Sequence, residues 1–223
     1  MKLILRYTVF IIGLYFLSLG IVLIVKSSLG TTPISSINYV VTLHTPITLG
    51  VATFLINVLL IAGQFWLIRG FGTRKDYMEI LLQLPLSLLF ALFIDINMAL
   101  FSGLVPSDYV AALCCLALGC VSQATGVALE LKPDVAIMSG EGFVKYAARR
   151  YRRDFGKLKV LFDVTLVSTA ILLSLCWSGQ IEGVREGTVV AALATGYIVT
   201  FLSRHVLTHA ALRRVGRICH AVR

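Results

Sequence analysis

The sequence predicts an all-α, polytopic membrane protein. Its composition, its apolar runs and the placement of its charges all support this class. Of the 223 residues, 58% are hydrophobic and 14% are charged, and the mean hydropathy is +0.90. A soluble domain usually carries about 25% charged residues. Several apolar runs reach about 18 residues or more, the length typical of transmembrane helices. These features exclude a water-soluble globule, a coiled coil, a disordered chain and a disulfide scaffold.

Six apolar runs each predict a transmembrane helix. At a rise of about 1.5 Å per residue, most of them can cross a hydrocarbon core of about 30 Å. The first is long for a signal peptide and no small-x-small cleavage site follows it, so we expect it to be retained. The last is uncharged only to Ser203, and we expect it to extend toward Ala210. The predicted spans cover residues 7–25, 47–68, 80–101, 109–129, 160–177 and 189–208.

The basic residues are concentrated in alternate loops. Of the 20 Lys and Arg residues, all but two lie at the N-terminus, after the second span, after the fourth span, or in the tail. The other three loops hold only Lys26 and Arg185. Because basic residues favour the cytoplasmic side, this predicts six spans with both termini in the cytoplasm. We expect the basic stretch 148–154 to contact anionic lipid headgroups, and we do not expect a nucleic-acid partner.

A shift of 106 residues aligns the two halves of the chain without a gap between positions 13 and 60. It places Gly13 on Gly119 and Gly20 on Gly126. Each half then consists of a long helix, a polar segment and two more long helices. Three spans per half is an odd number, so the second half must enter the bilayer from the opposite side. This predicts a 3+3 inverted-topology repeat in one membrane domain, an arrangement typical of secondary transporters, although duplication also occurs without transport. The repeats cover residues 1–103 and 104–210, and a basic tail covers 211–223.

The first polar segment predicts a short helix between the first two spans. Gly30 permits a break, Thr31 or Thr32 can cap a helix, and Pro33 suits the first helical turn. The helix is expected to run to about Leu43, which is too short to cross the bilayer. We therefore predict a re-entrant or interfacial half-helix. The alternative is an ordinary polar loop followed by a surface helix.

The second polar segment lies at the equivalent place in the other half. Ser139 is the expected cap, Gly140, Glu141 and Gly142 form the first turn, and the helix is expected to continue through Tyr146. Each short helix would present free N–H groups and the positive end of its dipole. Two such starts facing each other near mid-membrane predict a binding site for a carboxylate or phosphate on a small-molecule substrate.

Polar residues within the spans complete the predicted site. Asn57 and Gln123 are expected to line it, although such residues also join helices without any ligand. An acid within the membrane needs a partner or a function, so Asp163 and Asp95 in the spans and Glu141 in the second short helix are candidates for proton coupling. Simpler roles remain open for each: an ion pair of Asp163 with Lys159, complementarity of Glu141 to the helix dipole, and snorkelling of Asp95 at a helix end. Glu130 is expected at the membrane interface.

No enzyme motif is present in the sequence. There is no P-loop, no H-E-x-x-H and no G-x-S-x-G, so we predict neither catalytic residues nor a cofactor. The four histidines lie in loops or in the tail, and none of the five cysteines has metal-ligand spacing, so no metal site is predicted. The oligomeric state stays open.

Three motifs resemble those of the YczE/YitT-like bacterial membrane proteins. They are Leu29-Gly-Thr-Thr-Pro33, Phe155-Gly-Lys-Leu-Lys-Val-Leu-Phe-Asp163 and the turn Gly183-Val-Arg-Glu-Gly-Thr188. The resemblance extends over nearly the whole chain and implies a small polytopic fold in the bacterial inner membrane. The stretch Met138-Ser-Gly-Glu-Gly142 departs from the proline that relatives carry before Gly-Glu. Biochemical roles are poorly defined in this family, so the resemblance names no substrate.

These observations favour a secondary transporter for a small anionic or zwitterionic organic solute. Two other hypotheses remain open. One is a substrate-capture subunit of a multi-component uptake system, which would need a partner ATPase. The other is a non-transporting membrane scaffold or sensor that uses the basic cytoplasmic loop.

Overall fold

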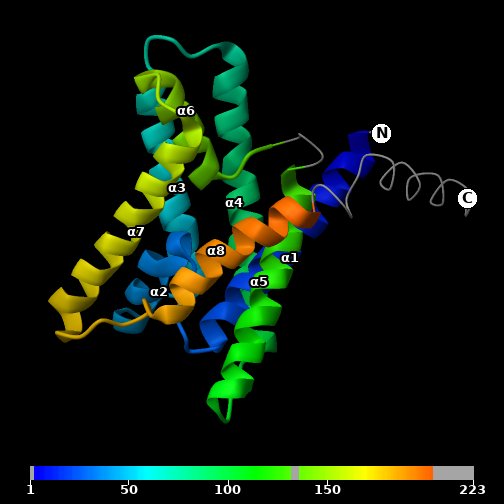
Figure 1. Cartoon of the computed structure of the whole chain (residues 1–223). Coiled ribbons are helices and arrows are strands. Elements are labelled where there is room, and N and C mark those ends of the chain that lie inside the picture. The colour runs from blue at the N-terminus through cyan, green and yellow to red at the C-terminus, as the bar shows by residue number, and fades with distance from the viewer. Residues whose placement is uncertain (1–2, 132–135, 203–223) are drawn as a thin grey trace, which may run out of the picture.

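The computed structural model describes residues 3–131 and 136–202, and within these ranges the chain forms helices and no strands. Figure 1 shows α1 and α5 side by side at one side of the bundle, with α3, α6 and α7 at the other. The helices are α1 (Leu3–Lys26), α2 (Pro33–His44), α3 (Leu49–Leu67), α4 (Arg74–Leu100), α5 (Tyr109–Leu131), α6 (Ser139–Tyr151), α7 (Phe155–Ser178) and α8 (Glu186–Phe201).

Five helices, α1, α3, α4, α5 and α7, are long and apolar enough to cross a membrane. The all-helical architecture is consistent with a polytopic membrane protein. The sixth predicted span corresponds to α8, which has 16 residues; its expected extension toward Ala210 lies outside the described residues. The short helices α2 and α6 have 12 and 13 residues, close to the lengths expected from the sequence.

Helix α4 begins six residues before the start of the predicted span. The hydroxyl of Thr73 accepts from the backbone N–H of Asp76, and the Asp76 carboxylate accepts from the backbone N–H of Thr73. This capping box satisfies N–H groups at the helix start, so the charged first turn is helical although it is not apolar. Arg149 of α6 also forms an ion pair of 3.1 Å with the carboxylate of Asp76, and this pair links α6 to the start of α4.

The closest helix packing joins α1 and α5, which run antiparallel. Ser122 donates to the carbonyl of Phe16, while Cys115, earlier in α5, contacts the carbonyl of Leu23, later in α1. Glycines let the two backbones approach, because a Cβ at Gly13 would lie 3.0 Å from the Gly126 carbonyl oxygen. A Cβ at Gly119 would lie 3.1 Å from the carbonyl oxygen of Gly20. Small residues at such crossings are typical of helix packing in membranes.

The remaining helices pack in pairs, and only some of them contact α1 or α5 (Figure 1). Helix α4 packs on α1 and α8 packs on α5. Helix α3 packs on α4, and the short helices cross between the groups, α2 against α7 and α6 against α3. Many large apolar side chains face outward, including Leu59 of α3, Leu92 of α4 and Leu172 of α7. Such an apolar exterior suits a lipid environment rather than water.

Charge differs between the two ends of the bundle. The α3–α4 and α6–α7 connections lie together at the top of Figure 1 and carry the described basic cluster. The α1–α2 and α7–α8 connections at the other end carry Lys26 and Arg185. The charge pattern predicted from the sequence is therefore grouped in space, since both basic connections lie at one end.

We predict that Gly20→Val and Gly126→Val each destabilise the protein by about 1–3 kcal/mol through overpacking. A side chain at Gly20 would collide with the backbone of Gln123, and one at Gly126 with the backbone of Leu17. The matched control is Gly196→Val in α8, where an added Cβ meets nothing within 4 Å. Thermal unfolding in detergent measures the effect, and equal stability of all three variants would contradict the α1–α5 contact.

Candidate functional site

Helix α2 begins at a break in the chain after α1. Gly30 has a φ of 141°, a conformation that favours glycine, and Pro33 occupies the first helical turn after Thr32 at the N-cap. The expected cap position is therefore confirmed at Thr32, although no side chain caps the helix. The hydroxyl of Thr31 donates to the carbonyl of Gly183 at 2.9 Å. A pocket of about 320 Å³ lies beside Gly30 and is lined partly by the α7–α8 connection.

Helix α6 begins one residue earlier than a Ser139 cap would require. Met138 occupies the N-cap and Ser139 is the first helical residue, so the predicted cap role of Ser139 is wrong. The physical reason is a better partner, because the Ser139 hydroxyl donates to Oδ1 of Asn57 on α3 at 2.7 Å. No side chain caps α6 either. Its first N–H groups are therefore not satisfied by a side-chain cap of its own.

The two short helices begin next to each other inside the bundle. The side chain of Ile34, in the first turn of α2, lies against Gly140, in the first turn of α6. Both starts are buried, since Thr32 is 2% exposed and Ser139 is 1% exposed. The two predicted segments therefore meet through Ile34 and Gly140, and neither segment is a loop on a hydrated surface.

One face of α3 contacts both short helices through polar side chains. Thr53 accepts from Nδ2 of Asn38 on α2 at 3.1 Å. One turn later Asn57 accepts from Ser139 of α6, and seven residues further Gln64 donates to the Ser139 carbonyl oxygen at 3.1 Å. Spacings of four and seven residues place all three side chains on one helix face. This buried polar stripe holds α2 and α6 at adjacent levels of the bundle.

A pair of glutamines supports the start of α6, and the sequence analysis missed it. Gln64 of α3 and Gln83 of α4 exchange two amide hydrogen bonds of 2.8 and 3.0 Å, and both are fully buried. A Cβ at Gly142 would lie 2.7 Å from Oε1 of Gln64, so the glycine allows α6 to pack on this pair. Gln64 could have been predicted from the sequence, because its seven-residue spacing from Asn57 places both polar side chains on the same face of the helix. Nothing comparable in the sequence pairs it with Gln83.

Several buried polar atoms near α6 lack a protein partner within the described part of the chain. They include Nδ2 of Asn57 and Oε1 of Glu130, whose residues are 6% and 3% exposed. Glu130 was expected at the membrane interface, and the structure shows its side chain buried within the bundle. The backbone N–H of Met138 is a hydrogen-bond donor to its carboxylate, which places Glu130 at the start of α6. Buried polar atoms without partners mark places where a ligand or a water can bind.

Acidic side chains surround the first turn of α6. Burial raises the pKa of the Glu141 carboxyl; nearby Lys159 lowers this pKa and Asp163 raises it. Lys159 and Asp163 form an ion pair of 2.6 Å, as the simpler hypothesis for Asp163 predicted. With Glu130, three acids and one lysine therefore act on this helix start. Within the described residues no group of three His, Cys, Asp or Glu side chains could hold a metal ion.

Two predicted site residues lie elsewhere. Asp95 accepts from the backbone N–H of Gly50 at 2.8 Å and from Thr48 at 2.7 Å, so it satisfies the start of α3. These hydrogen bonds explain why an acid is tolerated within α4, and they require no role for Asp95 in the candidate site. Gln123 lies against Gly20 in the α1–α5 contact, where its Oε1 has no partner among the described residues.

We predict that Gln83→Leu destabilises the protein by about 1–3 kcal/mol, because it leaves buried amide atoms of Gln64 without partners. The double variant Gln64→Leu with Gln83→Leu should cost less than the sum of the two single changes, since it removes both partners. Exposed Gln180→Leu is the control. Thermal unfolding of the four variants measures the coupling, and strictly additive changes would contradict the pairing.

Comparisons with known proteins add a family but no activity. Neither the curated proteins nor the solved structures contain a match to this chain. The YczE/YitT resemblance stays a prediction, because the family that matches carries a different designation and no assigned function. The match covers residues 4–204, which include every helix from α2 to α8 and nearly all of α1. The chain therefore belongs to DUF6198, a family of unknown function.

Proposed function

We propose that this protein is a secondary transporter of a small anionic or zwitterionic organic solute in a bacterial inner membrane. The observation that carries the proposal is the junction of α2 and α6, where Ile34 in the first turn of α2 lies against Gly140 of α6 and neither buried helix start has a side-chain cap. Helix starts inside a membrane bundle form substrate sites in secondary transporters, because their N–H groups and dipoles bind anionic groups. The unpartnered atoms of Asn57 and Glu130 supply further contacts at the same place.

The proposal includes a 3+3 inverted repeat, and reciprocal contacts support it. Residues 13 and 20 correspond to residues 119 and 126 under the shift of 106. Gly13 lies on Gly126 and Gly119 lies on Gly20, so the two contacts are equivalent. Whole helices follow the same rule, since α2 packs on α7 as α6 packs on α3, and α1 packs on α4 as α5 packs on α8. An antiparallel α1–α5 pair with such reciprocity is expected of halves with opposite orientations.

The two helix starts differ in charge, and this difference favours a zwitterion over a simple anion. Around α2, Thr31 and Thr32 bond to hydroxyls and backbone carbonyls. Around α6, Glu130 and Glu141 add two carboxyl groups, which carry negative charge when they are ionised and which the Lys159–Asp163 pair does not offset. A substrate carboxylate would therefore lie toward α2, and a substrate ammonium group toward α6. Glu130 and Glu141 are also the acids best placed to exchange a coupling proton.

We further propose that the basic end of the bundle faces the cytoplasm, as the positive-inside rule requires. This places both termini in the cytoplasm. The basic α6–α7 connection would then face the anionic lipid headgroups of the inner leaflet.

The transport proposal predicts that Asn57→Ala and Glu130→Gln reduce substrate flux about tenfold, since each removes a buried polar contact worth about 1.5 kcal/mol or more. Proteoliposomes supply the measurement, with radiolabelled glycine, serine, glutamate and lactate added with and without a pH gradient. Asn97→Ala is a matched control because Asn97 bonds to Ser18 of α1, away from both short-helix starts. Wild-type flux in both site variants would contradict the proposed site. Tight binding without flux would support the substrate-capture hypothesis instead.

The orientation predicts which loops an impermeant maleimide reaches in intact cells. In a chain without the native cysteines, Ser107→Cys in the α4–α5 connection should be labelled from outside. Arg153→Cys in the α6–α7 connection should react only after the membrane is disrupted. Both positions are exposed, so accessibility of the side chain does not distinguish them. The opposite labelling pattern would show that the basic end faces outward.

A further inference from the structure

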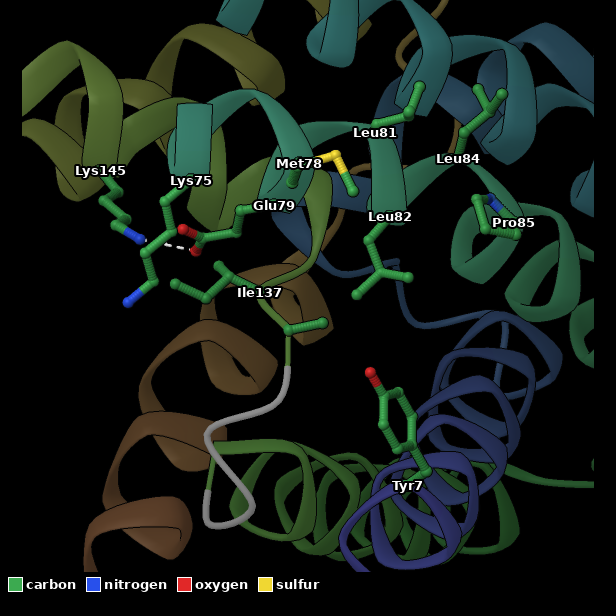
Figure 2. Close-up of a pocket in the computed structure, with 11 residues that line it drawn as sticks. Tyr7, Lys75, Met78, Glu79, Leu81, Leu82, Leu84, Pro85, Ile137 and Lys145 are labelled. Carbon is green, nitrogen blue, oxygen red and sulfur yellow. Dashed lines mark hydrogen bonds and ion pairs between the residues drawn. The ribbon is translucent and has the colours of Figure 1, made fainter. Parts of the chain in front are cut away.

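A cavity of about 770 Å³ lies between α1, α4 and the segment that leads into α6. Its size is within the range of small-molecule sites, about 300–1,000 Å³. Tyr7 of α1 faces Leu82 of α4 across it in Figure 2, and Ala136 and Ile137 line it from the segment before α6. It is separate from the polar stripe of α3, because none of Thr53, Asn57 and Gln64 lines it.

The cavity exists because α1 and α4 separate toward the basic end. At the other end they are in contact, where Asn97 donates to Ser18 at 2.9 Å and Tyr15 packs edge-on against Phe93. Pro85 lines the cavity and interrupts the backbone hydrogen-bond ladder of α4, which permits a helix to bend.

The lining is polar at one end and apolar at the other. Lys75, Glu79 and Lys145 gather at the start of α4, where Lys145 pairs with Glu79 at 2.6 Å (Figure 2). Within the described residues Lys75 has no ion-pair or hydrogen-bond partner. From Lys75 to Pro85 the helix rises about 15 Å, and the lining turns from charged to apolar along this distance. The cavity thus carries one unpaired positive charge above an apolar slot.

The cavity opens on the outer face of the bundle. Leu81 and Leu84 line it and are 55% and 40% exposed, on the same surface as the outward leucines of α4. In a bilayer this face meets acyl chains, and the basic end lies at the level of the lipid headgroups. An occupant must therefore have an anionic head and an apolar tail, and it must enter sideways from the lipid.

We infer that this cavity is a binding site for one anionic phospholipid of the membrane, with its phosphate on Lys75 and one acyl chain between Tyr7 and Leu82. Lysine binds phosphate as a point charge, and the Glu79–Lys145 pair leaves the charge of Lys75 available. The inference rests on the bundle lying in a bilayer and does not require that the protein transports. A failed transport assay therefore leaves it intact.

Native mass spectrometry of the full chain, delipidated in mild detergent, tests the site by titration with phosphatidylglycerol, phosphatidylcholine or soluble glycerol phosphate. We expect one phosphatidylglycerol to bind about tenfold more tightly than phosphatidylcholine, and glycerol phosphate not to bind. Lys75→Gln should remove this preference. Leu82→Trp should reduce binding of both lipids by filling the slot. The matched controls are Lys157→Gln, a basic residue outside the cavity, and Leu88→Trp, on the exposed face of α4.

Equal retention of the two lipids by the wild type would overturn the inference, as would wild-type retention by Lys75→Gln. Binding of glycerol phosphate with the same affinity as the lipid would show a headgroup site without an acyl slot. Lys75 is exposed, so its substitution does not threaten folding and decides the question even if Leu82→Trp unfolds.

Discussion

The structure depends on one constraint, which is that a helix beginning inside an apolar bundle must find partners for its first polar groups. In a bilayer core no water is available to supply them, and each unsatisfied group costs several kcal/mol. Helices α2 and α6 both begin in the interior, so the protein must surround these two starts with polar side chains. The stripe of Thr53, Asn57 and Gln64 on α3 does this from one side. The Thr31 hydroxyl donates to the Gly183 carbonyl and the Thr32 hydroxyl to Ser35, whereas the first N–H groups of α2 and α6 have no side-chain cap.

The close contact of α1 and α5 supports this arrangement from the opposite side of the bundle. Each of these helices leads directly into a segment that breaks and then starts a short helix. Because the glycines fix how the two long helices cross, they also fix where the two breaks fall relative to each other. Substituting a glycine at this crossing would therefore change the geometry of the candidate site as well as the stability of the protein. The effect would be indirect, because these glycines have no side chains that could line the site.

The sequence predicts the long helices well, because hydropathy summed over about 20 residues is a strong signal. It also predicts both short helices. Gly30 and Pro33 indicate the start of the first, and the stretch from Ser139 to Gly142 indicates the start of the second. It fails where the answer depends on tertiary neighbours. From the sequence alone Asp95 is a candidate functional acid, but in the fold its carboxylate accepts from the backbone N–H of Gly50. The cap role expected of Ser139 is lost because its hydroxyl donates instead to Asn57, 82 residues away in the sequence.

Glu130 shows the same limit most clearly, and it changes the chemistry expected of the site. Beside Lys132 at the end of an apolar run, it has the sequence of an interfacial residue. In the fold it is buried at the start of α6, beside the half-buried Glu141. When ionised, two acids at a helix N-terminus offset the positive end of the dipole there, whereas the start of α2 keeps its positive end. With both acids ionised the junction is dipolar, and under the transport proposal a complementary ligand would carry charges of both signs at a fixed separation. That requirement is stricter than the anion preference that two helix starts alone would impose.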